Sequence, residues 1–92
     1  MNEARETVEI VNNKGLHARA SAKFVNLVAM LPPQLNVKVL KDGTDAAGGS
    51  ILGLMMLGAA KGDTIEIHVA GDGAEGALAK LAGLVKDGFG ED

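Results

Sequence analysis

The hydrophobic residues of this chain recur at two different spacings, and the order of those spacings limits the folds available to it. From Thr7 to Val11 (TVEIV) apolar and polar residues alternate, which is typical of a strand with one buried face. From Ala18 to about Leu31 the spacing is helical, and Pro32-Pro33 ends it because proline cannot continue a helix. The expected apolar stripe of this helix comprises Ala18, Ala22, Val25 and Ala29, widened by Phe24, Val28 and Leu31.

The same two spacings continue to alternate along the rest of the chain. The remaining expected elements are a strand over Leu35–Val39, a hairpin turn over Lys41–Thr44 into a short third strand, an apolar helix from Ile51 to Leu57 ended by Gly58, a strand over Thr64–Val69, and a last helix with Ala74, Ala77, Leu78, Leu81 and Val85 on one face.

The resulting order is βαββαβα, in a single domain over residues 1–92. Four strands with one apolar face and three helices to cover it predict an α+β fold, a two-layer open-faced sandwich. Its four-stranded, mostly antiparallel sheet would be covered by helices on one face. The other face would be solvated, with Glu9, Lys38, Glu66 and His68 pointing outward.

Composition excludes several classes of protein. Without cysteine, disulfides and thiolate metal sites are impossible, and no cluster of ligands predicts a metal or cofactor. No apolar run approaches the roughly 20 residues that span a bilayer, and the polar start MNEARETVE is unlike a signal peptide, so we expect a cytoplasmic protein without membrane contact. A net charge of −3 and only two aromatic residues, Phe24 and Phe89, argue against nucleic-acid binding.

The segment from Asn13 to Arg19 (NKGLHAR) carries the clearest chemical signal. It places His17 between a glycine turn and the start of a helix, where unpaired N–H groups and the helix dipole attract anions. The same field, with Arg19 nearby, disfavours a protonated imidazole and favours the neutral form that a nucleophile requires. Taken alone, this spacing also fits an ordinary exposed histidine beside a solvated arginine.

Two further blocks extend the pattern into a family resemblance. Asn13-x-Gly15-Leu16-His17-Ala18-Arg19, followed by Ala22-x-Phe24-Val25, resembles the active-site signature of HPr, the histidine phosphocarrier of the phosphoenolpyruvate-dependent phosphotransferase system. The segment Gly49–Leu57 (GSILGLMML) resembles that family's regulatory serine segment, and Ala60-x-Gly62-Asp63 is a weaker third match. The resemblance covers nearly the whole chain, and βαββαβα is also the order of elements in HPr.

The resemblance implies a phosphoryl carrier rather than an enzyme. His17 corresponds to the histidine that Enzyme I phosphorylates on Nδ1 with phosphoenolpyruvate as the ultimate donor, and Arg19 to the arginine that assists the phosphoryl group. An enzyme IIA-type protein would be the acceptor, and we expect the carrier to be a monomer. Two branches stay open: sugar uptake, or a regulatory branch that ends in a nitrogen-type enzyme IIA.

Ser50 has two readings. Its position before an apolar helix is typical of an N-cap. By resemblance it also matches the serine that HPr kinase/phosphorylase modifies in some bacteria, and a phosphate there would place about two negative charges beside the docking surface. The expected docking residues are Leu16, Ala18, Ala20, Ile51, Leu52 and Met55.

One position departs from the family pattern. HPr proteins usually have proline directly after the arginine, whereas this chain has Ala20 followed by Ser21. Alanine restores a backbone N–H at the helix start, so the phosphate geometry of the family does not transfer unchanged. Two other classes remain for comparison: a regulatory relative that only binds partners, which His17 argues against because such relatives lack it, and a generic α/β ligand-binding or nucleic-acid module.

Overall fold

A computed structural model describes residues 2–91 and confirms the expected order of elements. The elements are β1 (Glu3–Glu9), α1 (Ala18–Ala29), β2 (Asn36–Lys41), β3 (Thr44–Ala47), α2 (Ile51–Met56), β4 (Thr64–Ala70), α3 (Ala74–Lys86) and a short 3₁₀ turn, η1 (Gly88–Gly90). In the part of the chain that the structure describes, no helix is long and apolar enough to cross a membrane.

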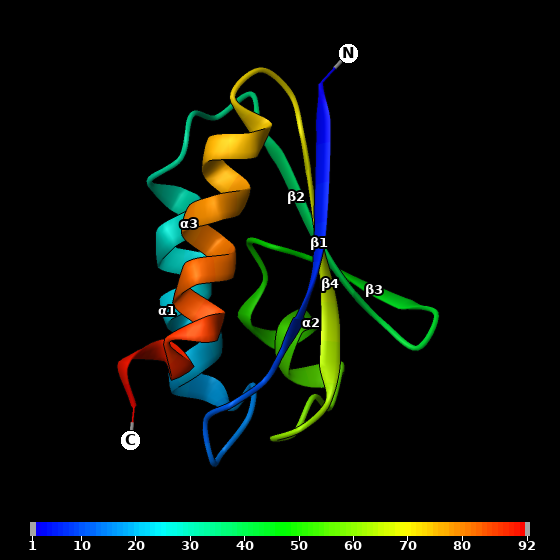
Figure 1. Ribbon diagram of the computed structural model, residues 1–92, viewed down its shortest axis with the longest axis vertical. Coiled ribbons are helices and arrows are strands. Elements are labelled where there is room, and N and C mark those ends of the chain that lie inside the picture. The colour runs from blue at the N-terminus through cyan, green and yellow to red at the C-terminus, as the bar shows by residue number, and fades with distance from the viewer. Residues whose placement is uncertain (1, 92) are drawn as a thin grey trace.

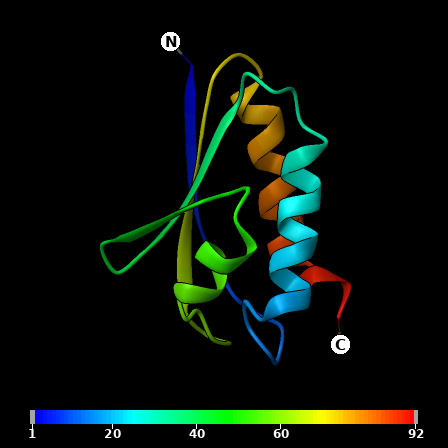
Figure 2. The same cartoon turned by 180° about the vertical axis from the view of Figure 1, so that it is seen from behind.

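The four strands form one sheet in the order β1-β4-β2-β3, and each neighbouring pair is antiparallel. Figure 1 shows this sheet nearly edge-on, with α1 and α3 lying side by side against one face and the other face bare. The reverse view in Figure 2 shows the same two layers. The predicted open-faced sandwich is therefore confirmed.

The core lies between these layers and is built from the residues that the alternation placed inward. Ile65, Ile67 and Val69 of β4 are buried, as are Val8 near the end of β1 and Ile10 just after it. The expected face of α3 is buried along its whole length, namely Ala74, Ala77, Leu78, Leu81 and Val85.

The first strand and the first helix differ from the prediction. β1 runs over Glu3–Glu9 rather than Thr7–Val11, because its polar first half pairs with β4 along a sheet edge where side chains are not buried. In α1 the buried face contains Ala20, Ser21 and Phe24, whereas Ala18 and Ala29 are exposed. Alanines on every side of this helix give little contrast, so the packing of Phe24 decides which face turns inward.

Smaller corrections concern helix ends and the bare face of the sheet. α1 ends at Ala29, two residues before Leu31, and α2 ends at Met56, with Leu57 as its C-cap. On the bare face His68 is half-buried rather than fully exposed, and its Nε2 lies 3.0 Å from Glu66 Oε1.

The fold gathers three separate segments at one end of the molecule. Figures 1 and 2 both place the start of α1, the short helix α2 and the turn η1 at the same end of the sandwich. α1 also packs directly against α2. Two of these segments are the blocks that the sequence singled out, and η1 is the third.

Candidate functional site

The turn before α1 fixes the position of His17. Gly15 has φ +63°, a left-handed conformation that favours glycine, and a Cβ there would lie 2.3 Å from the carbonyl oxygen of Ala59. The next residue, Leu16, donates its N–H to that oxygen at 2.9 Å. The turn is thus held against the loop before β4, and only glycine fits this close approach.

His17 is the N-cap residue of α1, but its side chain does not cap the helix. Its extended backbone (φ −75°, ψ −178°) lets its carbonyl accept the N–H of Ser21 at 2.9 Å, while the imidazole takes no part in the cap. The side chain is 25% exposed, so the ring can reach a partner from solvent. As at any helix start, the first N–H groups of α1 have no acceptor within the helix, which favours a bound anion nearby.

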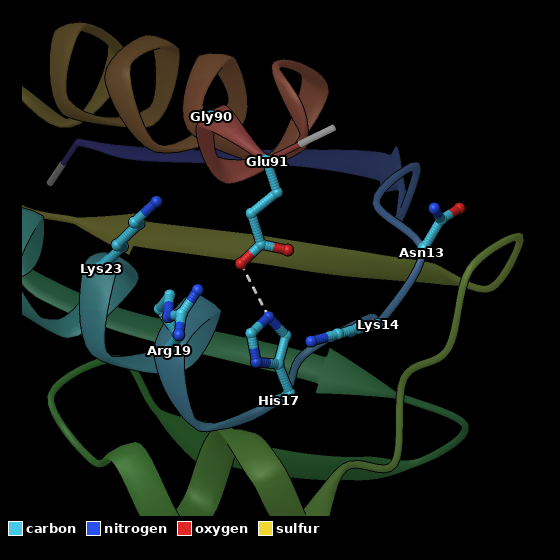
Figure 3. A pocket seen from close by; sticks show the side chains of 7 residues that line it. All are labelled: Asn13, Lys14, His17, Arg19, Lys23, Gly90 and Glu91. Carbon is cyan, nitrogen blue, oxygen red and sulfur yellow. Dashed lines mark hydrogen bonds and ion pairs between the residues drawn. The ribbon is translucent and has the colours of Figure 1, made fainter.

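A carboxylate that the sequence analysis missed holds the ring from the other side. Oε2 of Glu91 lies 2.7 Å from Nε2 of His17, and Figure 3 shows this carboxylate pointing at the ring. The buried amide of Asn12 donates to Glu91 Oε1 at 3.0 Å and to the Gly15 carbonyl at 2.8 Å. Asn12 therefore connects the glycine turn to the carboxylate.

Glu91 is ionised under ordinary conditions. Desolvation by burial raises the pKa of its carboxyl, but hydrogen bonds with Asn12 and His17 and electrostatic attraction to His17 and Lys23 outweigh that effect and hold this pKa below its ordinary value of 4.5. An ionised carboxylate can only accept a hydrogen bond, so the neutral ring carries its proton on Nε2. The lone pair then lies on Nδ1, on the side of the ring away from Glu91.

This contact revises one expectation. The sequence placed only positive neighbours, Arg19 and the helix start, beside His17, whereas the structure adds a negative one. Glu91 lies 74 positions along the chain from His17, and nothing local in the sequence signals the contact.

The site opens into a cavity of about 430 Å³ with a basic rim. Its lining residues are Asn13, Lys14, His17, Arg19, Lys23, Gly90 and Glu91, and all seven are drawn in Figure 3. Lys14, Arg19 and Lys23 bring three positive charges against the one carboxylate of Glu91. Such a cavity suits a small anion next to the ring.

The second predicted block, α2, presents an apolar surface at the same end of the molecule as the start of α1. Ser50 is the N-cap of α2, and its Oγ accepts the N–H of Gly53 at 2.9 Å, so the capping prediction is confirmed. Within α2 only Leu54 is buried. The exposed fractions are 40% for Ile51, 67% for Leu52, 40% for Met55 and 75% for Met56, a residue that the prediction omitted.

The docking prediction was wrong for two residues, which are buried. Leu16 is 5% exposed and Ala20 is 0% exposed, so both belong to the core and offer no surface to a partner. Leu16 belongs to the hydrophobic core, at the turn that its N–H holds against Ala59, and Ala20 lies on the same buried face of α1 as Phe24. Ala18 and Arg19 are exposed at the start of α1.

No candidate metal centre accompanies the site within residues 2–91. In that range no three His, Asp or Glu side chains come together in a way that could hold a metal ion.

The amino-acid sequence is similar to those of known proteins over nearly its whole length. The family described as "PTS HPr component phosphorylation site" matches residues 4–87. The phosphocarrier protein HPr of Neisseria meningitidis is 41% identical over 87 residues, which cover 95% of this chain and 96% of that protein. The phosphocarrier protein NPr of Escherichia coli is 38% identical over 88 residues, 96% of this chain and 97% of that protein.

A solved structure shows the same fold. The crystal structure of HPr from Thermoanaerobacter tengcongensis superposes with a TM-score of 0.87 at 36% identity and covers 100% of this chain and 99% of that one. The sandwich fold is therefore shared with a solved HPr structure.

Proposed function

The chain belongs to the HPr family of phosphotransferase-system phosphocarriers, and from this premise we propose that His17 Nδ1 is the atom that carries the phosphoryl group. The observation that supports it is the hydrogen bond between Nε2 and Glu91, which leaves the Nδ1 lone pair free. In the forward step this lone pair forms a bond to the phosphorus of phosphorylated Enzyme I. The bond between phosphorus and the donor breaks, and the donor keeps its electron pair.

The positive surroundings would hold the phosphoryl oxygens. The free N–H groups at the start of α1 and the planar guanidinium of Arg19 can both donate to phosphate oxygens. Ala20 contributes its backbone N–H to this start, where the family usually has a proline that lacks one. The protein would act as a carrier between enzymes, since its partners supply the catalysis in both directions.

The exposed face of α2 is the proposed docking surface for Enzyme I and for an enzyme IIA-type acceptor. Ile51, Leu52 and Met55 expose apolar area on α2. Figure 1 places α2 at the same end of the molecule as the start of α1, where His17 is the N-cap residue. Methionine side chains adapt to differently shaped partners, which suits a protein that must meet at least two. A monomer with this surface needs only a small, transient interface around the reacting atom.

Ser50 is the proposed regulatory site, modified by an HPr kinase/phosphorylase. A phosphate at the start of α2 would keep the cap but add about two negative charges next to Ile51. Ser50→Asp should therefore leave the fold intact and weaken docking to Enzyme I. Unchanged affinity in a titration with Enzyme I would contradict this blockade.

The carrier role is tested by incubation with Enzyme I, magnesium and labelled phosphoenolpyruvate. The unaltered protein should take up an acid-labile, base-stable phosphoryl group, and His17→Ala should take up none. The matched control is His68→Ala, which removes the other histidine and should label normally. Label on His17→Ala would refute the site, and no label on the unaltered protein would refute the carrier role.

The same assay assigns the branch of the system. The Neisseria HPr and the Escherichia NPr are similar to this chain to nearly the same degree. The labelled protein is therefore offered in parallel to a sugar-type and a nitrogen-type enzyme IIA. Faster transfer to the nitrogen-type acceptor would place it in the regulatory branch, our alternative, and faster transfer to the sugar-type acceptor in sugar uptake.

A further inference from the structure

The segment Gly88–Glu91 is fastened over the start of α1 by contacts that its own turn does not require. Phe89 is 1% exposed and has φ +58°, a left-handed conformation that is unfavourable for a bulky side chain. Its carbonyl accepts a hydrogen bond from Lys23 Nζ of α1 at 2.6 Å. Burial of the ring and this bond from α1 hold the strained turn, and the next residues bring Glu91 to His17.

A second unusual feature is Asn12, a polar residue that is buried in the core. It is 1% exposed, and within residues 2–91 its buried Oδ1 has no hydrogen-bond partner. A buried acceptor without a partner is unfavourable, so Asn12 does not stabilise the core by satisfying all of its own hydrogen-bonding groups. Its amide nitrogen instead uses both hydrogens, one on the Gly15 turn and one on Glu91.

On the premise that His17 carries the phosphoryl group, we propose that Glu91, held by Asn12 and by the buried Phe89 turn, is a positioning residue for phosphoryl transfer. Its carboxylate keeps the proton on Nε2 of His17 both before and after the transfer. Nδ1 is thereby kept as the nitrogen that receives the group and later releases it.

The change in ring charge during phosphoryl transfer explains why a carboxylate is favourable beside Nε2 of His17. When Nδ1 bonds to phosphorus, the proton stays on Nε2 and the ring gains one positive charge, which Glu91 faces at 2.7 Å. In the return step the acceptor's nucleophile bonds to phosphorus, and the electron pair of the P–N bond goes back to Nδ1. No proton has to leave or enter the protein, and a protonated ring is the better leaving group.

The test compares Glu91→Ala and Glu91→Gln with Glu75→Gln, an exposed glutamate in the first turn of α3 that serves as the charge-matched control. The first readout is nitrogen NMR of ¹⁵N-histidine-labelled protein at a pH where the rings are neutral. The unaltered protein should show His17 with its proton on Nε2, and Glu91→Ala should show a mixture of both tautomers. His68, the only other histidine, is the internal control in the same spectrum.

The second readout is the rate of phosphoryl uptake from Enzyme I. Because Glu91→Ala removes a hydrogen bond to a charged group, we expect its rate of phosphoryl uptake to fall by about tenfold or more. Glu91→Gln can accept the hydrogen bond but carries no charge, so its uptake rate should lie between those of Glu91→Ala and the unaltered protein. Glu75→Gln should take up the group as fast as the unaltered protein.

The outcomes separate this inference from the carrier role. No uptake by the unaltered protein would overturn the carrier role and the inference with it. Uptake by the unaltered protein together with an unshifted tautomer in Glu91→Ala, or with a Glu91→Ala rate within twofold, would overturn the inference alone. A shifted tautomer and a slowed rate together would support it.

Discussion

Replacing Gly15 by alanine tests how tightly the histidine turn is built, and Gly58 offers a matched control. Both glycines have nearly the same left-handed φ, +63° and +66°, so alanine meets similar backbone strain at each. At Gly58 nothing lies within 4 Å of the added Cβ, whereas at Gly15 it would lie 2.3 Å from Ala59 O and 2.9 Å from Ala60 Cα. The difference between the two variants therefore isolates the contact with the Ala59–Ala60 backbone.

The structure gives an order of magnitude for each variant. Left-handed strain of about 1–2 kcal/mol, partly offset by the smaller entropy of the unfolded chain, gives about 1 kcal/mol for Gly58→Ala. Gly15→Ala adds backbone displacement and strains the bond from Leu16 N–H to Ala59 O, for a total of about 2–4 kcal/mol. In a domain of this size that corresponds to a melting temperature lower by roughly 10–30 °C.

Urea unfolding of both variants, followed by far-ultraviolet circular dichroism, measures the two free energies. Gly15→Ala should also take up phosphoryl groups more slowly than Gly58→Ala under conditions where both are folded, because the turn places His17. If Gly15→Ala were no less stable than Gly58→Ala, the close contact with Ala59 could not be what fixes the turn.

Three further perturbations follow from the same contacts. Ser50→Ala removes the cap on α2 and should lower the free energy of unfolding by about 1 kcal/mol; an unchanged urea midpoint would contradict the cap. Glu91 has a lowered pKa in the folded protein, so its stabilising contribution is present above the unfolded value of about 4.5 and is lost as the pH falls through the lower folded value. The stability difference between the unaltered protein and Glu91→Gln should therefore shrink below about pH 4.5, and a difference independent of pH would contradict it. Arg19→Gln, at an exposed position, should slow phosphoryl transfer while changing stability by less than about 0.5 kcal/mol, so a large shift in the urea midpoint would reveal a structural role instead.

Strand alternation and helix ends made most of the sandwich predictable from the sequence. Ile65, Ile67 and Val69 point inward as their period-2 pattern predicts, and Ser50 caps α2 as its position predicts. The face of α1 was predicted less well, because alanine fits core and surface alike and only Phe24 marks the buried side.

The candidate site was only half visible in the sequence. His17 and Arg19 stand together in one motif, so their shared place at the cavity was predictable. Glu91 reaches the same cavity through the fold, by way of the buried Phe89 and the amide of Asn12, and no local pattern records that contact. Leu16 and Ala20 show the converse case, in which neighbours of a motif residue in sequence are core residues in space.

The most direct test of His17 as the carrier is to locate the phosphorus on the ring. Protein labelled with ¹⁵N-histidine and phosphorylated by Enzyme I and phosphoenolpyruvate should show phosphorus–nitrogen coupling to Nδ1 of His17, with the proton still on Nε2. Coupling to Nε2, the nitrogen that faces Glu91 in this structure, or to His68 would contradict the assignment of Nδ1 as the phosphoryl-carrying atom.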